Sequence, residues 1–272
     1  MMDEIQSAWF VPLGGRPASP TSIELFCLPF AGGNAMNFRA WPSHGRALQI
    51  TGVEYPGRGS RFGEPPLHSV IDMSQQLAAA ILARKPAHFA LFGHSMGADI
   101  AFKTAQVLEA AGVVPLCVCL SARQAPHLPS RRKDIHHLPK NAFREELLRL
   151  GGTTPEVIAS EELMALFEPL LRADFCLAEQ RRLEDLGPIQ APILTLSGST
   201  DPFLNELDAV GWALYTSSSH AHESVNGDHF FMINRACEVV PVLEQALKRI
   251  LDFKKWCPGE DLNLHALAST ST

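Results

Sequence analysis

The chain reads Leu91-Phe92-Gly93-His94-Ser95-Met96-Gly97 where an apolar run over residues 89–92 ends. This pattern predicts a buried strand, a sharp turn and a following helix. In the spacing G-x-S-x-G the serine occupies a strained strand-to-helix turn that neighbouring backbones approach closely, so side chains at Gly93 or Gly97 would collide with them. The turn would place the Ser95 hydroxyl at a helix N-terminus, where negative charge is favoured. An ordinary strand–helix turn fits the same five residues, so the interpretation depends on partner residues elsewhere.

The composition fits one large α/β domain. The chain has 272 residues, 46% of them hydrophobic, which is enough for a sizeable core. A formal net charge of -6 argues against nucleic acid as a partner. We find neither an apolar run of transmembrane length nor a signal-peptide pattern, so we expect no membrane association. The six cysteines lack C-x-x-C spacing and are interpreted as free thiols of a cytoplasmic protein. We also expect a monomer.

Strand-like and helical patterns alternate along most of the chain. Strands are expected at 23–28, 50–55, 89–92, 114–120, 192–197 and 221–225, after a polar lead-in over 1–21. Helices are expected from Val70 to Ile81, from Ser95 to Gly112 and over 239–251. This alternation is typical of a mostly parallel sheet flanked by helices.

Residues 122–187 interrupt the alternation, because they contain no strand-like run. One helix is expected to end at Gly151-Gly152 and another to begin at Pro155, while Pro169 predicts either a break or a kink. An all-helical insertion between strands suggests a lid over the site, although helices that simply pack on the sheet remain an alternative. We expect residues 1–253 to form a single domain and 254–272 to be a disordered tail.

Polar residues suited to nucleophilic catalysis follow three of the predicted strands, in the order Ser95, Asp201, His229. A serine hydroxyl needs an adjacent base, histidine has a suitable pKa, and a carboxylate fixes the histidine tautomer. Parallel strands end at one edge of a sheet, so the three side chains should meet there. Their order is that of an α/β-hydrolase, and we predict this fold with these residues as a catalytic triad.

The loop after the first strand, residues 29–34, is interpreted as the oxyanion loop. It contains a glycine pair but neither G-x-x-x-x-G-K-S/T nor G-x-G-x-x-G, so phosphate binding is not expected. We predict instead that the backbone N–H of Ala31 (or Phe30) and that of Met96 stabilise the oxyanion. A plain strand-to-helix turn is the alternative.

Other acidic residues and His94 fit the triad less well. Asp228 adjoins His229 in one loop, Asp208 lies far past its strand, and Asp174 falls in a predicted lid helix. His94 lies in the turn itself, where its side chain should point away from the site.

His220 and His222 have the spacing of a metal pair, but no carboxylate or thiolate cluster supports them, so we interpret them as surface residues and expect no metal. Arg58 and Arg61 could bind an anionic group, although a solvated or loop-pinning role is favoured. The basic cluster 131–133 is interpreted as a solvated face that could attract an acidic partner.

Several segments together resemble the type II thioesterases, the stand-alone editing enzymes of nonribosomal peptide and polyketide synthesis. The likeness runs from about Trp9 to Phe253. Its segments are Leu25-Phe26-Cys27-Leu28-Pro29-Phe30-Ala31-Gly32-Gly33, Glu54-Tyr55-Pro56-Gly57-Arg58-Gly59, Gly93-His94-Ser95-Met96-Gly97, Leu150-Gly151-Gly152-Thr153, Pro169-Leu170-Leu171-Arg172-Ala173-Asp174 and Gly227-Asp228-His229-Phe230-Phe231.

The resemblance implies hydrolysis of acyl groups from the phosphopantetheine arm of acyl or peptidyl carrier proteins, a mobile helical lid, and no cofactor or metal. The family often carries a tyrosine soon after the Arg-Ala-Asp-Phe segment, where this chain reads Ala178-Glu179-Gln180-Arg181, so no acyl preference is implied. A hydrolase of free medium-chain thioesters or small esters and an inactive binding scaffold are the alternatives.

Overall fold

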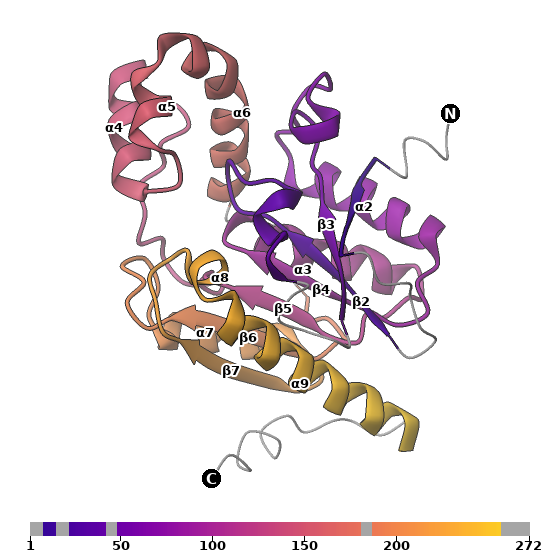
Figure 1. Cartoon of the computed structure of the whole chain (residues 1–272). Coiled ribbons are helices and arrows are strands. Elements are labelled where there is room, and N and C mark those ends of the chain that lie inside the picture. The colour runs from indigo at the N-terminus through magenta and orange to yellow at the C-terminus, as the bar shows by residue number, and fades with distance from the viewer. Residues whose placement is uncertain (1–7, 15–21, 42–47, 181–186, 257–272) are drawn as a thin grey trace.

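The computed structural model describes residues 8–14, 22–41, 48–180 and 187–256 (Figure 1). Its sheet has the order β1-β3-β2-β4-β5-β6-β7, and every neighbouring pair is parallel except β1 with β3. The strands are β1 (Phe10–Leu13), β2 (Ile23–Leu28), β3 (Leu48–Val53), β4 (Phe89–His94), β5 (Val118–Ser121), β6 (Ile193–Gly198) and β7 (His220–Val225). All six predicted strands are present. The seventh, β1, lies in the stretch interpreted as a polar lead-in, so that interpretation is wrong for residues 10–13.

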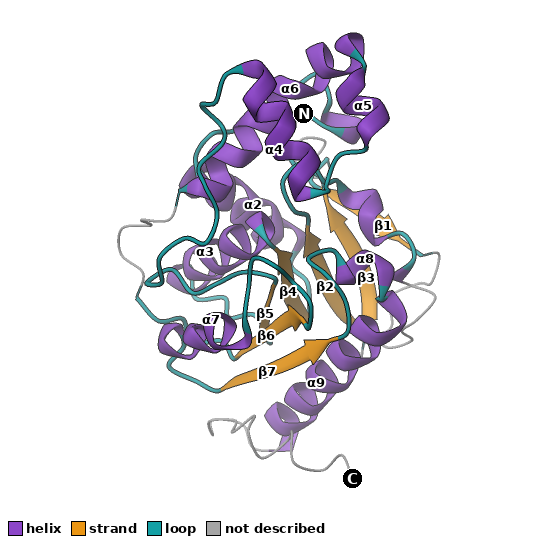
Figure 2. Ribbon diagram, turned by 90° about the vertical axis from the view of Figure 1, so that its left-hand side faces the viewer, coloured by secondary structure: helices purple, strands orange, loops and turns teal. Residues whose placement is uncertain are grey.

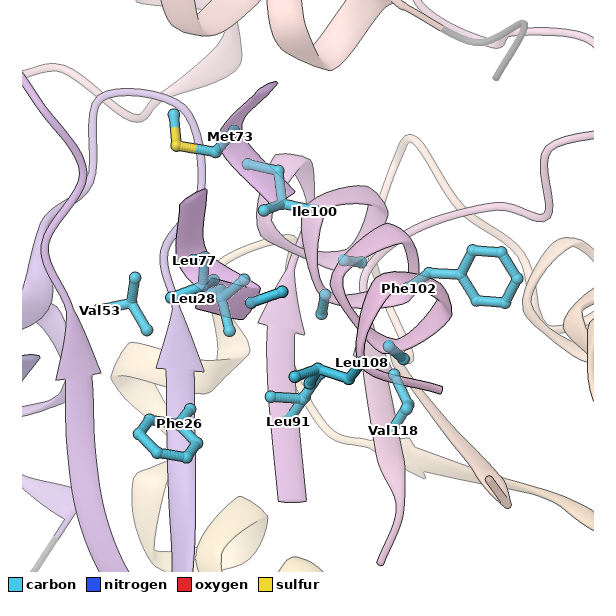
Figure 3. Packing of buried hydrophobic residues seen from close by; sticks show 14 of the residues in the cluster. Phe26, Leu28, Val53, Met73, Leu77, Leu91, Ile100, Phe102, Leu108 and Val118 are labelled. Atoms are coloured by element: carbon cyan, nitrogen blue, oxygen red, sulfur yellow. The ribbon is translucent and has the colours of Figure 1, made fainter. Parts of the chain in front are cut away.

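Helices cover both faces of the sheet (Figure 2). On one face lie α2 (Val70–Arg84) and α3 (Met96–Ala110), and on the other lies α9 (Ala236–Trp256). Every residue of β2, β4, β5 and β6 is buried, as expected for parallel strands between two helical layers. Figure 3 shows part of the first layer, where Phe26 and Leu91 of the strands lie in one cluster with Leu77 and Leu108 of the helices.

Three helices lie between β5 and β6 in the sequence and form a group apart from the other helices (Figure 1): α4 (Lys140–Leu150), α5 (Pro155–Ala159) and α6 (Glu161–Glu179). The predicted end of α4 is confirmed, because Gly151 caps it with φ of 76°. Pro169 lies inside α6, and the break between helices comes at Ser160 instead. Buried side chains of these helices, with one from the segment before them, form a cluster distinct from the two on the faces of the sheet, called the lid cluster below after the predicted lid: Ile135, Phe143, Leu147, Ile158, Met164 and Leu171.

Shorter elements complete the described part of the chain: η1 (Ala35–Phe38), η3 (Gly59–Arg61), α7 (Glu206–Val210), η4 (Gly211–Tyr215) and α8 (Phe231–Asn234). Helix α9 continues three residues past 253, and the rest of the predicted tail, residues 257–272, lies outside the described residues. None of the helices described here has the length and apolar character needed to cross a bilayer.

Candidate active site

The turn after β4 has the strained geometry that the G-x-S-x-G spacing predicts. Ser95 has φ of 55° and ψ of -114°, a backbone conformation that residues other than glycine rarely adopt. A Cβ added to Gly93 would lie 2.1 Å from the carbonyl oxygen of Gly97, and one added to Gly97 would lie 2.3 Å from that of Leu28. The predicted collisions are therefore confirmed, and both positions require glycine.

Asp201 and His229 meet beyond the carboxyl ends of β6 and β7. The His229 Nδ1–H donates to Asp201 Oδ2 at 2.7 Å, and the backbone N–H of Phe203 donates to the other carboxylate oxygen at 2.8 Å. The carboxylate can only accept, so the proton resides on Nδ1 and Nε2 is left with its lone pair. Gly198 permits this approach of the two loops, because a Cβ there would lie 2.5 Å from the carbonyl oxygen of Asp228.

Ser95 and His229 line one cavity together with Ala31 of the predicted oxyanion loop. The cavity has a volume of about 410 Å³, including space open to solvent. Helices α4 and α6 and the turn between α4 and α5 contribute part of its wall, chiefly Leu147, Leu150 and Phe175. The predicted nucleophile, base and oxyanion loop thus face a mostly apolar space beneath the inserted helices.

His94 does not line this cavity, but it contacts the backbone of His229, which does. Its buried ring donates from Nε2 to the carbonyl oxygen of His229 at 2.9 Å, while Nδ1 accepts from the Ser121 hydroxyl at 2.9 Å. Burial, and secondly the charge of His229, lower the pKa of His94 well below 6.5, so its ring is neutral. The sequence predicted that His94 points away from the site, but not that it holds the backbone of His229.

Arg132 is the residue of the cavity that the sequence interpretation missed. Its Nη2 donates to His229 Nε2 at 2.8 Å, and its guanidinium lies 4.2 Å from the centre of the Phe203 ring. Burial lowers the pKa of His229, and the positive charge of Arg132 lowers it further. Arg132 therefore occupies the lone pair that Ser95 would need. Its neighbour Arg131 pairs with Asp208 at 2.6 Å, so the basic cluster is not simply a solvated face.

Two further arginines have the predicted loop-pinning role and are not solvated. The side chain of Arg58 pairs with Asp174 of α6 at 2.6 Å, and that of Arg61 pairs with Glu64 at 2.6 Å. Arg61 also lies 4.2 Å from the centre of the Trp9 ring. Both arginine side chains are at least 95% buried.

The two histidines of the possible metal pair lie against strand β6. His220 is 6% exposed and bonds Thr195, and His222 bonds both Thr195 and Ser197, so the predicted surface location is wrong for His220. Among the residues with a described position, no group of three or more metal-binding side chains occurs.

A family model described as the thioesterase domain matches residues 23–247. The chain belongs to the thioesterase family. Linear gramicidin dehydrogenase LgrE of Brevibacillus parabrevis is 33% identical over 90% of this thioesterase and 94% of LgrE. Thioesterase PikA5 of Streptomyces venezuelae is 34% identical over 82% of this chain and 80% of PikA5.

Solved structures extend the likeness to the fold. YbtT, a type II thioesterase from the yersiniabactin NRPS/PKS biosynthetic pathway, superposes on this thioesterase with a TM-score of 0.82 and 32% identity, over 89% of this chain and 99% of YbtT. The resemblance seen in the sequence and the predicted α/β-hydrolase fold are therefore confirmed. The protein is a serine-dependent thioester hydrolase related to type II thioesterases.

Proposed function

We propose that this thioesterase removes acyl groups from the phosphopantetheine arm of acyl or peptidyl carrier proteins during nonribosomal peptide or polyketide synthesis. Mis-primed or stalled carriers would be its substrates. The membership of YbtT in such a pathway supports this assignment. The single observation that carries the chemistry is the 2.7 Å bond from His229 to Asp201, because His229 lines the same cavity as Ser95.

In the proposed reaction, Arg132 first withdraws from His229 Nε2, which then accepts the proton of Ser95. The Ser95 oxygen attacks the thioester carbonyl, and Asp201 stabilises the imidazolium that forms. His229 then returns the proton to the departing thiol of phosphopantetheine, leaving an acyl-enzyme. A water molecule activated by the same histidine releases the acid.

The oxyanion would be stabilised by the backbone N–H groups of Met96 and Ala31. Met96 follows Ser95 at the N-terminus of α3, so its N–H lies at the positive end of the helix dipole. Ala31 lines the same cavity as Ser95. Loss of one such donor typically costs about 10²–10³ in rate.

The test is release of one acyl group from a phosphopantetheinyl carrier protein, with the same acyl group on coenzyme A measured alongside. Native enzyme is compared with Ser95→Ala, which should lower kcat by roughly 10⁶, and with Ser60→Ala at an exposed serine as the control. Release that needs Ser95 and strongly favours the carrier supports the proposal. Serine-dependent release without that preference would indicate a thioesterase for free substrates, and no serine-dependent release would favour a binding scaffold.

A further inference from the structure

A buried carboxylate on lid helix α6 contacts the predicted oxyanion loop. Asp174 Oδ2 accepts from the backbone N–H of Gly32 at 2.7 Å and from Arg58 Nη1 at 2.8 Å. Asp174 Oδ1 accepts from Arg58 Nη2 at 2.6 Å. We propose that Asp174 is a positioning residue that holds the oxyanion loop in its active geometry, so that α6 and the oxyanion donors move together. This inference rests on the proposed function of the site.

The loop and the helix fit closely at this point. Gly32 has φ of 79°, a conformation that favours glycine, and a Cβ there would lie 2.8 Å from the side chain of Leu171 on α6. The N–H of Gly33 donates to the carbonyl oxygen of Phe30 at 2.9 Å, which closes a tight turn around Ala31. The bond from Gly32 to Asp174 therefore fixes the peptide directly after the proposed donor Ala31.

Arg58 connects the same carboxylate to a second point of the loop. Its Nη1 donates both to Asp174 and to the carbonyl oxygen of Gly33 at 2.9 Å, and its guanidinium lies 5.0 Å from the centre of the Tyr55 ring. The side chains of Arg58 and Asp174 are 5% and 1% exposed. A buried ion pair often adds little net stability over apolar residues of similar size. The role proposed for this pair therefore depends on its location between α6 and the oxyanion loop, and not on its contribution to stability.

Oxyanion donors accelerate a reaction because they are already oriented before charge develops. An enzyme whose loop is released from Asp174 would still bind substrate against the apolar wall of the cavity. It would, however, present the Ala31 N–H in several orientations. Loss of the contact should consequently lower kcat and leave KM nearly unchanged.

The experiment removes the ion pair in both test proteins and varies only the acceptor for Gly32. The two double variants are Arg58→Met with Asp174→Leu and Arg58→Met with Asp174→Asn. Leucine and asparagine are similar in size, but only asparagine offers an oxygen to the Gly32 N–H. Glu168→Gln is the control, because Glu168 is on α6 and pairs with Arg172 at 2.8 Å. Each variant is assayed with a small activated ester, and amide exchange is followed by mass spectrometry in a peptide covering residues 29–34.

The leucine variant should have a kcat about tenfold or more below that of the asparagine variant, with KM within about threefold. Exchange in the peptide 29–34 should also be faster in the leucine variant only. Equal kcat values, or equal exchange, in the two double variants would overturn the positioning role. The ester assay needs no carrier protein, so a failure of the carrier-protein assignment would appear separately, as native activity without carrier preference.

Discussion

Replacing Phe143 with alanine should open the predicted lid, helices α4, α5 and α6, while leaving the sheet intact. The side chain is fully buried in the lid cluster. The centre of its ring lies 6.0 Å from that of Phe175, in an edge-to-face arrangement, and 4.2 Å from the Arg172 guanidinium. Truncation of a buried phenylalanine costs about 3–5 kcal/mol. The six buried members of the lid cluster pack apart from the clusters of the sheet, so the loss should fall on opening of these helices rather than on unfolding of the whole domain.

Each 1.4 kcal/mol corresponds to a factor of ten in an equilibrium, so amide exchange in α4 should accelerate by about two to three and a half orders of magnitude. Exchange in β4 should change far less. Leu148→Ala on the same helix is the control, because that side chain is 46% exposed and should cost within about 0.5 kcal/mol. Equal acceleration in α4 and β4 would refute the idea that the lid opens as its own unit.

Three further predictions concern the site and its support. Arg132→Gln removes a positive charge that lowers the pKa of His229, so the acid limb of the kcat/KM profile should move to higher pH; an unmoved limb would contradict the contact with Nε2. Gly97→Ala should destabilise the fold by about 1–3 kcal/mol or more in urea unfolding, because its Cβ would lie 2.3 Å from the carbonyl oxygen of Leu28, whereas Gly63→Ala, with nothing within 4 Å, should be neutral. The pKa of His94 is lower in the folded than in the unfolded chain, so protonation of the unfolded chain should lower the free energy of unfolding below about pH 6.5. For one proton the slope is at most about 1.4 kcal/mol per pH unit. An unfolding free energy that stays constant from about pH 7.5 to 5.5 would argue against a neutral buried ring.

The sequence predicted the elements whose pattern is set by burial. Strands β2, β4 and β6 are buried on both faces and are mostly apolar in sequence, and α2 and α9 bury one regular stripe. The sequence pattern did not predict the edge strand β1. It has only four residues, contains Pro12 and, within the described chain, pairs on one side with β3. Its burial pattern is mixed, so periodicity gave no signal.

The proposed triad could be predicted because each member follows a strand, and the strand ends share one edge of the sheet. Arg132 could not be, because it lies in the irregular stretch between β5 and α4, where no periodicity relates sequence to direction. The contact of Asp174 with Gly32 joins residues 142 positions apart and depends on how α6 packs. Such contacts follow from tertiary packing, and local patterns do not encode them.

The separate packing of the lid has a consequence for protein engineering. Phe143 and Leu171 belong to the lid cluster, whereas Leu177, six residues after Leu171 on α6, belongs to the core beneath α2 and α3. The segment from α4 into α6 could therefore be exchanged between relatives without altering the strands of the sheet. Such a chimera would take the cavity wall at Leu147 and Leu150 from the donor and keep the proposed nucleophile and base of the recipient. We expect such chimeras to differ from the recipient in the acyl group that they prefer.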